Sequence, residues 1–168
     1  MSTDQSPFLR TKALLFERLS PTLDENPATQ SGYIGLEEVK RSIIEQLGYL
    51  FNTRTAPPPP DQLTGSGTAQ PLTVLDYGVP DFSAWSVGDM SKMRMLVRSI
   101  EQAITAFEPR LRAVRAELVD TNPSSLEQAL HIRLSAQLHV EPLTDSLKLY
   151  LVLSGKYGTV SVYEREPS

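Results

Sequence analysis

The sequence predicts an α+β fold, with N-terminal helices and one long helix packed on a C-terminal antiparallel sheet of three to four strands. Apolar residues recur at three- and four-residue steps before Pro109, and they alternate with polar residues after it. Helices followed by a run of strands are typical of this class. The 168 residues are 40% hydrophobic and 21% charged, which predicts one domain over residues 1–168.

The N-terminal third is expected to contain two helices and a loop. Phe8 to Leu19 fits a helical spacing but is short, and Ser20 to Ile34 is rich in loop-forming residues. The stronger helix begins near Leu36, where Glu37 and Glu38 suit the positive end of a helix dipole. Its apolar face consists of Leu36, Val39, Ile43, Leu47 and Leu50.

Two segments are expected to lie outside the regular structure. Residues 1–10 form a loose N-terminus, and residues 55–71 form a Pro/Gly/Ser-rich insertion loop. The loop begins with four prolines, which make a short stiff spacer, and continues as a flexible run of Gly and Ser. A surface loop explains this composition, although a proline-rich ligand for an aromatic groove has the same composition.

A turn segment, V-L-D-Y-G-V-P-D-F, runs from Val74 to Phe82. Asp76 and Asp81 place two carboxylates in it, but a calcium loop needs a denser set of oxygen ligands. We therefore expect these aspartates to cap the local backbone. The long helix follows from about Gly88 to Phe107, with its apolar face at Met93, Val97, Ile100, Ile104 and Phe107.

The helix is expected to end at the stretch A-F-E-P-R-L-R, because Pro109 disfavours helical geometry at Glu108. Glu108 and Arg110 then project from a stiff corner between helix and sheet. Two interpretations are equally open. The two side chains form a self-contained ion pair, or they form a fixed recognition point for the charges of a partner.

The remaining sequence predicts strands. They are expected at Arg112 to Val119, Leu130 to Val140, Leu147 to Leu153 and Val160 to Tyr163, with a turn at Asp120 to Ser125 and a hairpin connection at Ser154 to Gly158. Either of the last two strands offers an edge to which a partner strand could pair. Lys148, Lys156 and the charged tail after Tyr163 would oppose such pairing.

Several function classes find no support in the composition. The net charge is −4 and the pI about 5.2, so no basic surplus marks a nucleic-acid binder. There is no cysteine, no secretory signal and no long apolar run, which predicts a cytoplasmic chain without direct membrane insertion. No cofactor or metal motif occurs.

No catalytic constellation is expected either. His131 and His139 share the polar face of one strand but lie about 27 Å apart at about 3.3 Å per residue. Glu108 could be proposed as the acid of a glycoside hydrolase, but Arg110 would keep it ionised and no second carboxylate is marked.

Four stretches carry a resemblance to a known family. They are L-F-E-R-L (Leu15 to Leu19), L-F-N-T-R (Leu50 to Arg54), V-L-D-Y-G-V-P-D-F (Val74 to Phe82) and I-x-x-F-E-P-R-L-x-x-V (Ile104 to Val114). In order and spacing, the chain from about Leu14 to the last strand resembles the TssE family. This is a type VI secretion baseplate component related to phage baseplate wedge proteins and labelled phage lysozyme-like. The E-P-R-L element is the most specific match.

The resemblance implies a non-enzymatic structural protein, with a fold like the core of the sheath protein. It implies that this protein lies in the cytoplasm within a membrane-docked baseplate, where it links the baseplate to the sheath and seeds sheath polymerisation by strand exchange. The implied partners are the wedge subunits TssF, TssG and TssK and the sheath proteins TssB and TssC. The implied partner-binding residues are Glu108, Pro109 and Arg110.

Two other functions remain as alternatives. A peptidoglycan-cleaving enzyme would degrade cell wall by itself and lose that activity on one carboxylate change. A small-molecule-binding module would be stabilised by its ligand.

Overall fold

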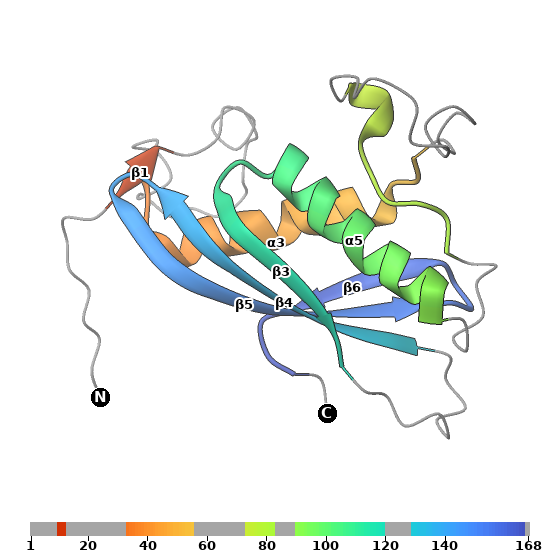
Figure 1. Ribbon diagram of the computed structural model, residues 1–168. Coiled ribbons are helices and arrows are strands. Elements are labelled where there is room, and N and C mark those ends of the chain that lie inside the picture. Colours follow the sequence, from red (N-terminus) through yellow and green to blue (C-terminus); the bar gives the residue numbers. More distant parts are fainter. Residues whose placement is uncertain (1–9, 13–32, 56–72, 83–89, 120–128, 167–168) are drawn as a thin grey trace.

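The computed structural model describes residues 10–12, 33–55, 73–82, 90–119 and 129–166. In this part of the chain two α-helices lie on one face of a four-stranded antiparallel sheet (Figure 1). The helices are α3, Leu36–Asn52, and α5, Met90–Phe107. The strands are β3, Leu111–Leu118; β4, Ala129–Val140; β5, Leu143–Ser154; and β6, Thr159–Tyr163. The predicted α+β class is confirmed.

The helix predicted at Phe8 to Leu19 is wrong at the residues of this stretch that the structure describes. Thr11–Lys12 form a short strand, β1, which pairs with β2 at Tyr33–Ile34 inside the predicted loop. Thr11 is β-branched and buried, and Ile34 opposite it is also buried. This pairing suits an extended backbone, whereas an isolated short helix is marginal. Residues 8–9 and 13–32 lie outside the described part.

The sheet is a simple meander in which each strand pairs with the next, in the order β3-β4-β5-β6. β4 and β5 pair along their whole length, so β5 begins at Leu143 rather than at the predicted Leu147. Paired residues share a face, which puts the leucines of β4 and β5 together on the helix side. Leu134 faces Leu149 in this way, and both are almost fully buried.

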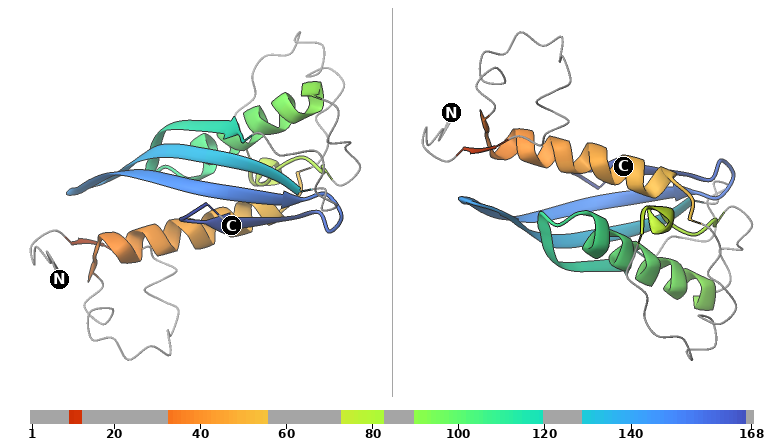
Figure 2. Two further views of the ribbon diagram at one scale, coloured as in Figure 1. Left: turned by 90° about the horizontal axis from the view of Figure 1, so that it is seen from below. Right: turned by 90° about the horizontal axis from the view of Figure 1, so that it is seen from above.

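The two helices share one face of the sheet, and each covers the half of it near one edge. α5 packs beside β3 and α3 beside β6, as the two views of Figure 2 show. Their apolar faces meet the same layer of strand leucines. The largest fully buried side chains are Phe51, Ile43, Leu47, Leu50, Leu96, Ile100, Ile104, Ile132, Leu134, Leu138, Leu149 and Leu151. The predicted core faces of both helices are therefore confirmed.

The segment 73–82 packs against the end of α3. Asp76 accepts hydrogen bonds from the backbone N–H and hydroxyl of Thr73, which confirms the predicted capping role of Asp76. Gly78 has φ 128°, and a Cβ there would lie 2.5 Å from the Thr53 carbonyl oxygen. Only glycine fits this close approach, which explains the glycine in the V-L-D-Y-G-V-P-D-F stretch.

Several predictions fall outside the described residues. They concern the N-terminus 1–9, most of the 55–71 loop, the turn at 120–125 and the start of the long helix at 88–89. Neither described helix combines the length and the apolar composition needed to cross a membrane.

Candidate functional site

The corner predicted from A-F-E-P-R-L-R lies between α5 and β3. The Glu108 N–H donates to Ile104 O at 2.8 Å, as the last bond of the helix, and the Leu111 N–H donates to Glu108 O at 3.1 Å. The chain therefore turns within two residues, and Pro109 is exposed at the apex. Proline at this place fixes the backbone and prevents the helix from continuing.

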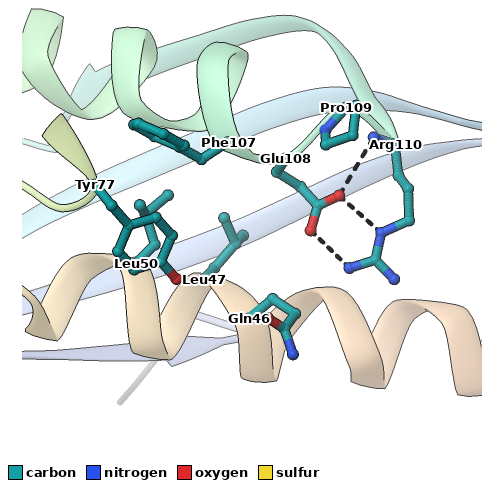
Figure 3. Close-up of a pocket in the computed structure, with 8 residues that line it drawn as sticks. All are labelled: Gln46, Leu47, Leu50, Tyr77, Phe107, Glu108, Pro109 and Arg110. Atoms are coloured by element: carbon teal, nitrogen blue, oxygen red, sulfur yellow. Dashed lines mark hydrogen bonds and ion pairs between the residues drawn. The ribbon is translucent and has the colours of Figure 1, made fainter. Parts of the chain in front are cut away.

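Glu108 and Arg110 pair with each other. Arg110 Nη2 lies 2.6 Å from Glu108 Oε2, and Arg110 Nε donates to Glu108 Oε1 at 2.7 Å. The guanidinium thus binds both carboxylate oxygens (Figure 3). Of the two interpretations left open by the sequence, the structure contains the self-contained pair. The expectation that Glu108 projects is wrong, because this satisfied carboxylate is 5% exposed.

The pair also connects the corner to α3. Arg110 Nη1 donates to Ser42 Oγ at 2.8 Å, and Ser42 is buried on α3. Glu108, Arg110 and Ser42 therefore form a strut between the end of α5 and the middle of α3. The side chains of Arg110 and Glu108 are only 12% and 6% exposed, so removing one of them leaves a nearly buried charge.

A cavity of about 200 Å³ opens beside the strut. Its lining residues are Gln46, Leu47, Leu50, Tyr77, Phe107, Glu108, Pro109 and Arg110 (Figure 3). The rings of Tyr77 and Phe107 meet edge to face with centroids 5.3 Å apart. Burial, and then the negative charge of Glu108, raise the pKa of the Tyr77 phenol. The cavity therefore has an apolar wall on one side and the strut on the other.

The cavity brings together residues that the sequence did not place at one site. Glu108, Pro109 and Arg110 were expected to act together, and they do line one surface. Gln46 and Tyr77 were missed as site residues. Tyr77 lies in a stretch that carried the family resemblance, but nothing in the spacing indicated that it meets Phe107.

The site has no visible catalytic chemistry among the described residues. Both oxygens of Glu108 accept hydrogen bonds from Arg110, and no second carboxylate lines the cavity. No group of three or more metal-ligating side chains occurs among these residues. His131 and His139 lie at positions of β4 that face away from the helices, on one face as predicted, and both are half-buried.

The outer edge of the sheet at β6 is partly closed by α3. Asn52 Nδ2 donates to Val160 O at 2.9 Å, and the Val160 N–H donates to Asn52 Oδ1 at 3.0 Å. The amide of Asn52 thus takes the place that a neighbouring strand would occupy. Val162 directs its backbone groups to the same side, because outward and inward residues alternate, and these groups have no partner among the described residues.

The opposite edge, at β3, is closed by α5. The Ala116 N–H donates to Glu101 Oε1 at 2.8 Å. A bulge between Arg112 and Arg115, with Ala113 at φ 50°, also interrupts this strand. Bulges and capping side chains both oppose the addition of another strand, so β6 is the more open edge.

Known proteins share sequence with this chain. A family model described as "Baseplate wedge protein gp25" matches residues 37–143, which include nearly all of α3, all of α5, the corner, β3 and β4, and end at the first residue of β5. The anti-adapter protein IraD of Salmonella arizonae is 27% identical over 135 residues, which cover 79% of this chain and 95% of IraD.

A solved chain, from a structure described as "The baseplate complex from the type VI secretion system", is 20% identical with a TM-score of 0.48. That match covers 69% of this chain and 94% of the solved one. The family match alone extends over more than half of the sequence. The chain therefore belongs to the baseplate wedge protein gp25 family.

Proposed function

We propose that this chain is a non-enzymatic structural component of the baseplate wedge in a type VI secretion system. The observation that carries the proposal is the family match over residues 37–143, in which the most specific motif forms a braced corner. A carboxylate held by two arginine bonds suits a scaffold that fixes geometry and is poorly suited to proton transfer.

The partner-binding site in this proposal is the surface around Glu108, Pro109 and Arg110. Glu108 and Arg110 set the shape of the corner by bracing it against Ser42. The exposed Pro109 and the adjoining cavity then supply the contact surface. A preformed corner loses little entropy on binding, which favours a fixed place in an assembly. The expected partners there are the wedge subunits TssF, TssG and TssK.

The link to the sheath in this proposal is made by β6. Val162 directs its N–H and C=O outward, next to the segment capped by Asn52, and neither group has a partner among the residues that the structure describes. An extended strand of a sheath protein, TssB or TssC, would pair with these groups. Such pairing would extend the sheet across the baseplate–sheath junction and seed sheath polymerisation.

The first experiment tests the cavity beside the corner. Gln46→Trp places a bulky ring over the cavity from α3, and Glu45→Trp introduces the same ring one residue away at an exposed position outside the lining. The strut stays intact in both variants. From cells that carry the secretion system, wild type and Glu45→Trp should co-purify with TssF and TssG, whereas Gln46→Trp should lose them while remaining folded by circular dichroism.

Two results would overturn parts of this proposal. A folded wild-type chain that captures none of the wedge and sheath proteins argues against a baseplate role. Retention of the wedge subunits by Gln46→Trp shows that they bind elsewhere on the chain.

The second experiment tests the edge. Val162→Pro deletes the outward N–H without removing a bond to β5, and Val162→Ala keeps the N–H while shortening the side chain. Sheath assembly, followed by sedimentation of TssB–TssC tubules, should fail with Val162→Pro and persist with Val162→Ala. Equal assembly with both variants argues against strand pairing at Val162.

A second candidate function is favoured by one observation. The match to the anti-adapter protein IraD covers 95% of that protein, so a similar sequence also occurs in a protein named for a different role. An anti-adapter function predicts capture of a protein outside the baseplate in the same co-purification.

A further inference from the structure

One face of the four-stranded sheet has no helix on it in the described part of the chain. Both α3 and α5 lie on the opposite face (Figures 1 and 2). The strand register assigns side chains to this open face, since residues paired across strands share a side. One row across the sheet is Arg115, Ser135 and Lys148, and the next row is Glu117, Arg133, Tyr150 and Tyr163.

The open face is basic, although the chain as a whole carries a net charge of −4. Its cations are Arg112 and Arg115 on β3, Arg133 on β4 and Lys148 on β5. Within the four strands, Glu117 is the one carboxylate assigned to this face by the register. The charge of the open face is therefore opposite in sign to that of the whole molecule. An anion would be attracted by the cations of this face and not by the molecule as a whole.

Ion pairs within the described part of the chain do not account for the gathering of these cations on one face. None of the four forms an ion pair with another described residue. By contrast, Lys40 and Arg110, which lie toward the helix layer, both have carboxylate partners. Like charges that gather on one surface repel each other slightly, so ion pairing within the described residues does not explain their grouping.

Aromatic side chains lie among the cations. The Arg133 guanidinium lies over the Tyr150 ring at 5.9 Å, and Tyr163 beside Tyr150 is 44% exposed. Arginine and tyrosine are the residues that most often carry binding energy in protein interfaces. The row therefore offers both charge and apolar contact area.

We infer that this open face is a docking surface for an acidic segment of a partner protein. The cations would bind carboxylates, and Tyr150 and Tyr163 would contact the apolar parts of the same segment. A short acidic protein segment fits better than a nucleic acid, because it can be confined to these cations, whereas a continuous polyphosphate track would extend beyond them onto the rest of an acidic chain. Although Tyr163 lies on β6, the four cations lie on β3, β4 and β5 and point away from the corner, so the charged face can fail without affecting the function proposed above.

The test uses the full chain and fluorescent poly-L-glutamate as the probe. The open-face triple variant is Arg112→Glu, Arg115→Glu and Lys148→Glu. The control triple, Arg41→Glu, Arg94→Glu and Arg98→Glu, makes the same change in net charge at exposed helix positions. Wild type should bind the probe more weakly as salt rises, the open-face triple should bind about tenfold more weakly, and the control should stay close to wild type.

The competing outcomes are distinct. Equal weakening by both triples, or no binding by wild type at low salt, overturns the proposal. Binding of single-stranded oligo-dT but not of poly-L-glutamate also overturns it, in favour of a nucleic acid. A wild-type dimer that the open-face triple converts to a monomer overturns it in favour of a second copy. If the charge-reversal triple does not fold by circular dichroism, the corresponding Gln triple takes its place and is expected to weaken binding in the same direction.

Discussion

On the helix-covered side of the sheet the cations Lys40 and Arg110 have carboxylate partners, whereas on the open face Arg112, Arg115, Arg133 and Lys148 have none among the described residues. The covered side contains the leucine core and the strut, and both depend on close fit. The difference separates buried residues, which hold the fold together, from exposed open-face residues, which do not. Substitutions of the buried core and of the strut should lower the free energy of unfolding, whereas those at exposed open-face positions should mainly change what the chain binds.

The largest effect on the free energy of unfolding is expected for a truncation in the core. Its control is a substitution at the neighbouring residue on the open face. Leu134→Ala removes a side chain that is 1% exposed between the sheet and the helices, and should lower the free energy of unfolding by about 3 to 4 kcal/mol. Ser135→Ala, one residue along β4 on the open face, should change it by less than about 0.5 kcal/mol. Urea unfolding of both variants measures the difference, and similar losses would contradict the separation.

The next effect compares two glutamates. Glu108→Gln removes the charge that neutralises Arg110 in the buried strut, and should cost about 2 to 3 kcal/mol in unfolding free energy. Glu117→Gln on the open face should cost less than about 0.5 kcal/mol. Chemical denaturation measures both free energies. A Glu108→Gln variant as stable as wild type would show that the strut does not stabilise the corner. The strut also makes alanine substitutions at Glu108 or Arg110 poor tests of binding, since they alter stability.

The smallest effect concerns the ion pair between α3 and β5. Lys40 Nζ lies 2.9 Å from Asp145 Oδ2, and this hydrogen bond lowers the pKa of Asp145 below its ordinary value of 3.8. Because the folded-state pKa is the lower one, the stabilisation is present above about pH 3.8 and is lost as the pH falls through the folded-state pKa. The Asp145 side chain is 35% exposed, so the contribution is screened to about 0.5 kcal/mol.

Thermal unfolding across acid pH measures this contribution. Asp145→Asn should lower stability slightly at neutral pH and approach wild type as the pH falls through the lowered folded-state pKa of Asp145, where the native carboxylate becomes protonated as well. The same hydrogen bond raises the pKa of Lys40 above 10.5, so the contribution is also lost as the pH rises through that folded-state pKa. A variant that differs from wild type most strongly in acid would contradict this account.

Much of the fold could be predicted because periodicity is a local signal. The alternation from Leu130 to Val140 fixed both the strand and its buried side, and Leu36 to Leu50 fixed the face of α3. The strand at Thr11 could not be predicted, because its pairing with Ile34 depends on a distant residue. Dense apolar residues in a short segment do not distinguish a helix from a strand.

The site was predicted in position but not in geometry. Pro109 indicated the end of the helix, and Glu108 and Arg110 were expected at the corner. That the pair is buried and braced by Ser42 depends on how α3 packs against α5, which sequence spacing does not show. The Asn52 and Glu101 edge caps were missed for the same reason, since their partners Val160 and Ala116 lie on other elements.

The most direct test of the central claim is hydrogen–deuterium exchange of the full chain, free and in a wedge complex with TssF and TssG. Backbone amides at the corner, near Phe107 and Arg110, should exchange more slowly in the complex. The buried core of β4 should be unchanged, because it is already protected in the free chain. Failure of the folded chain to enter the complex, or protection that spares the corner, would contradict the account.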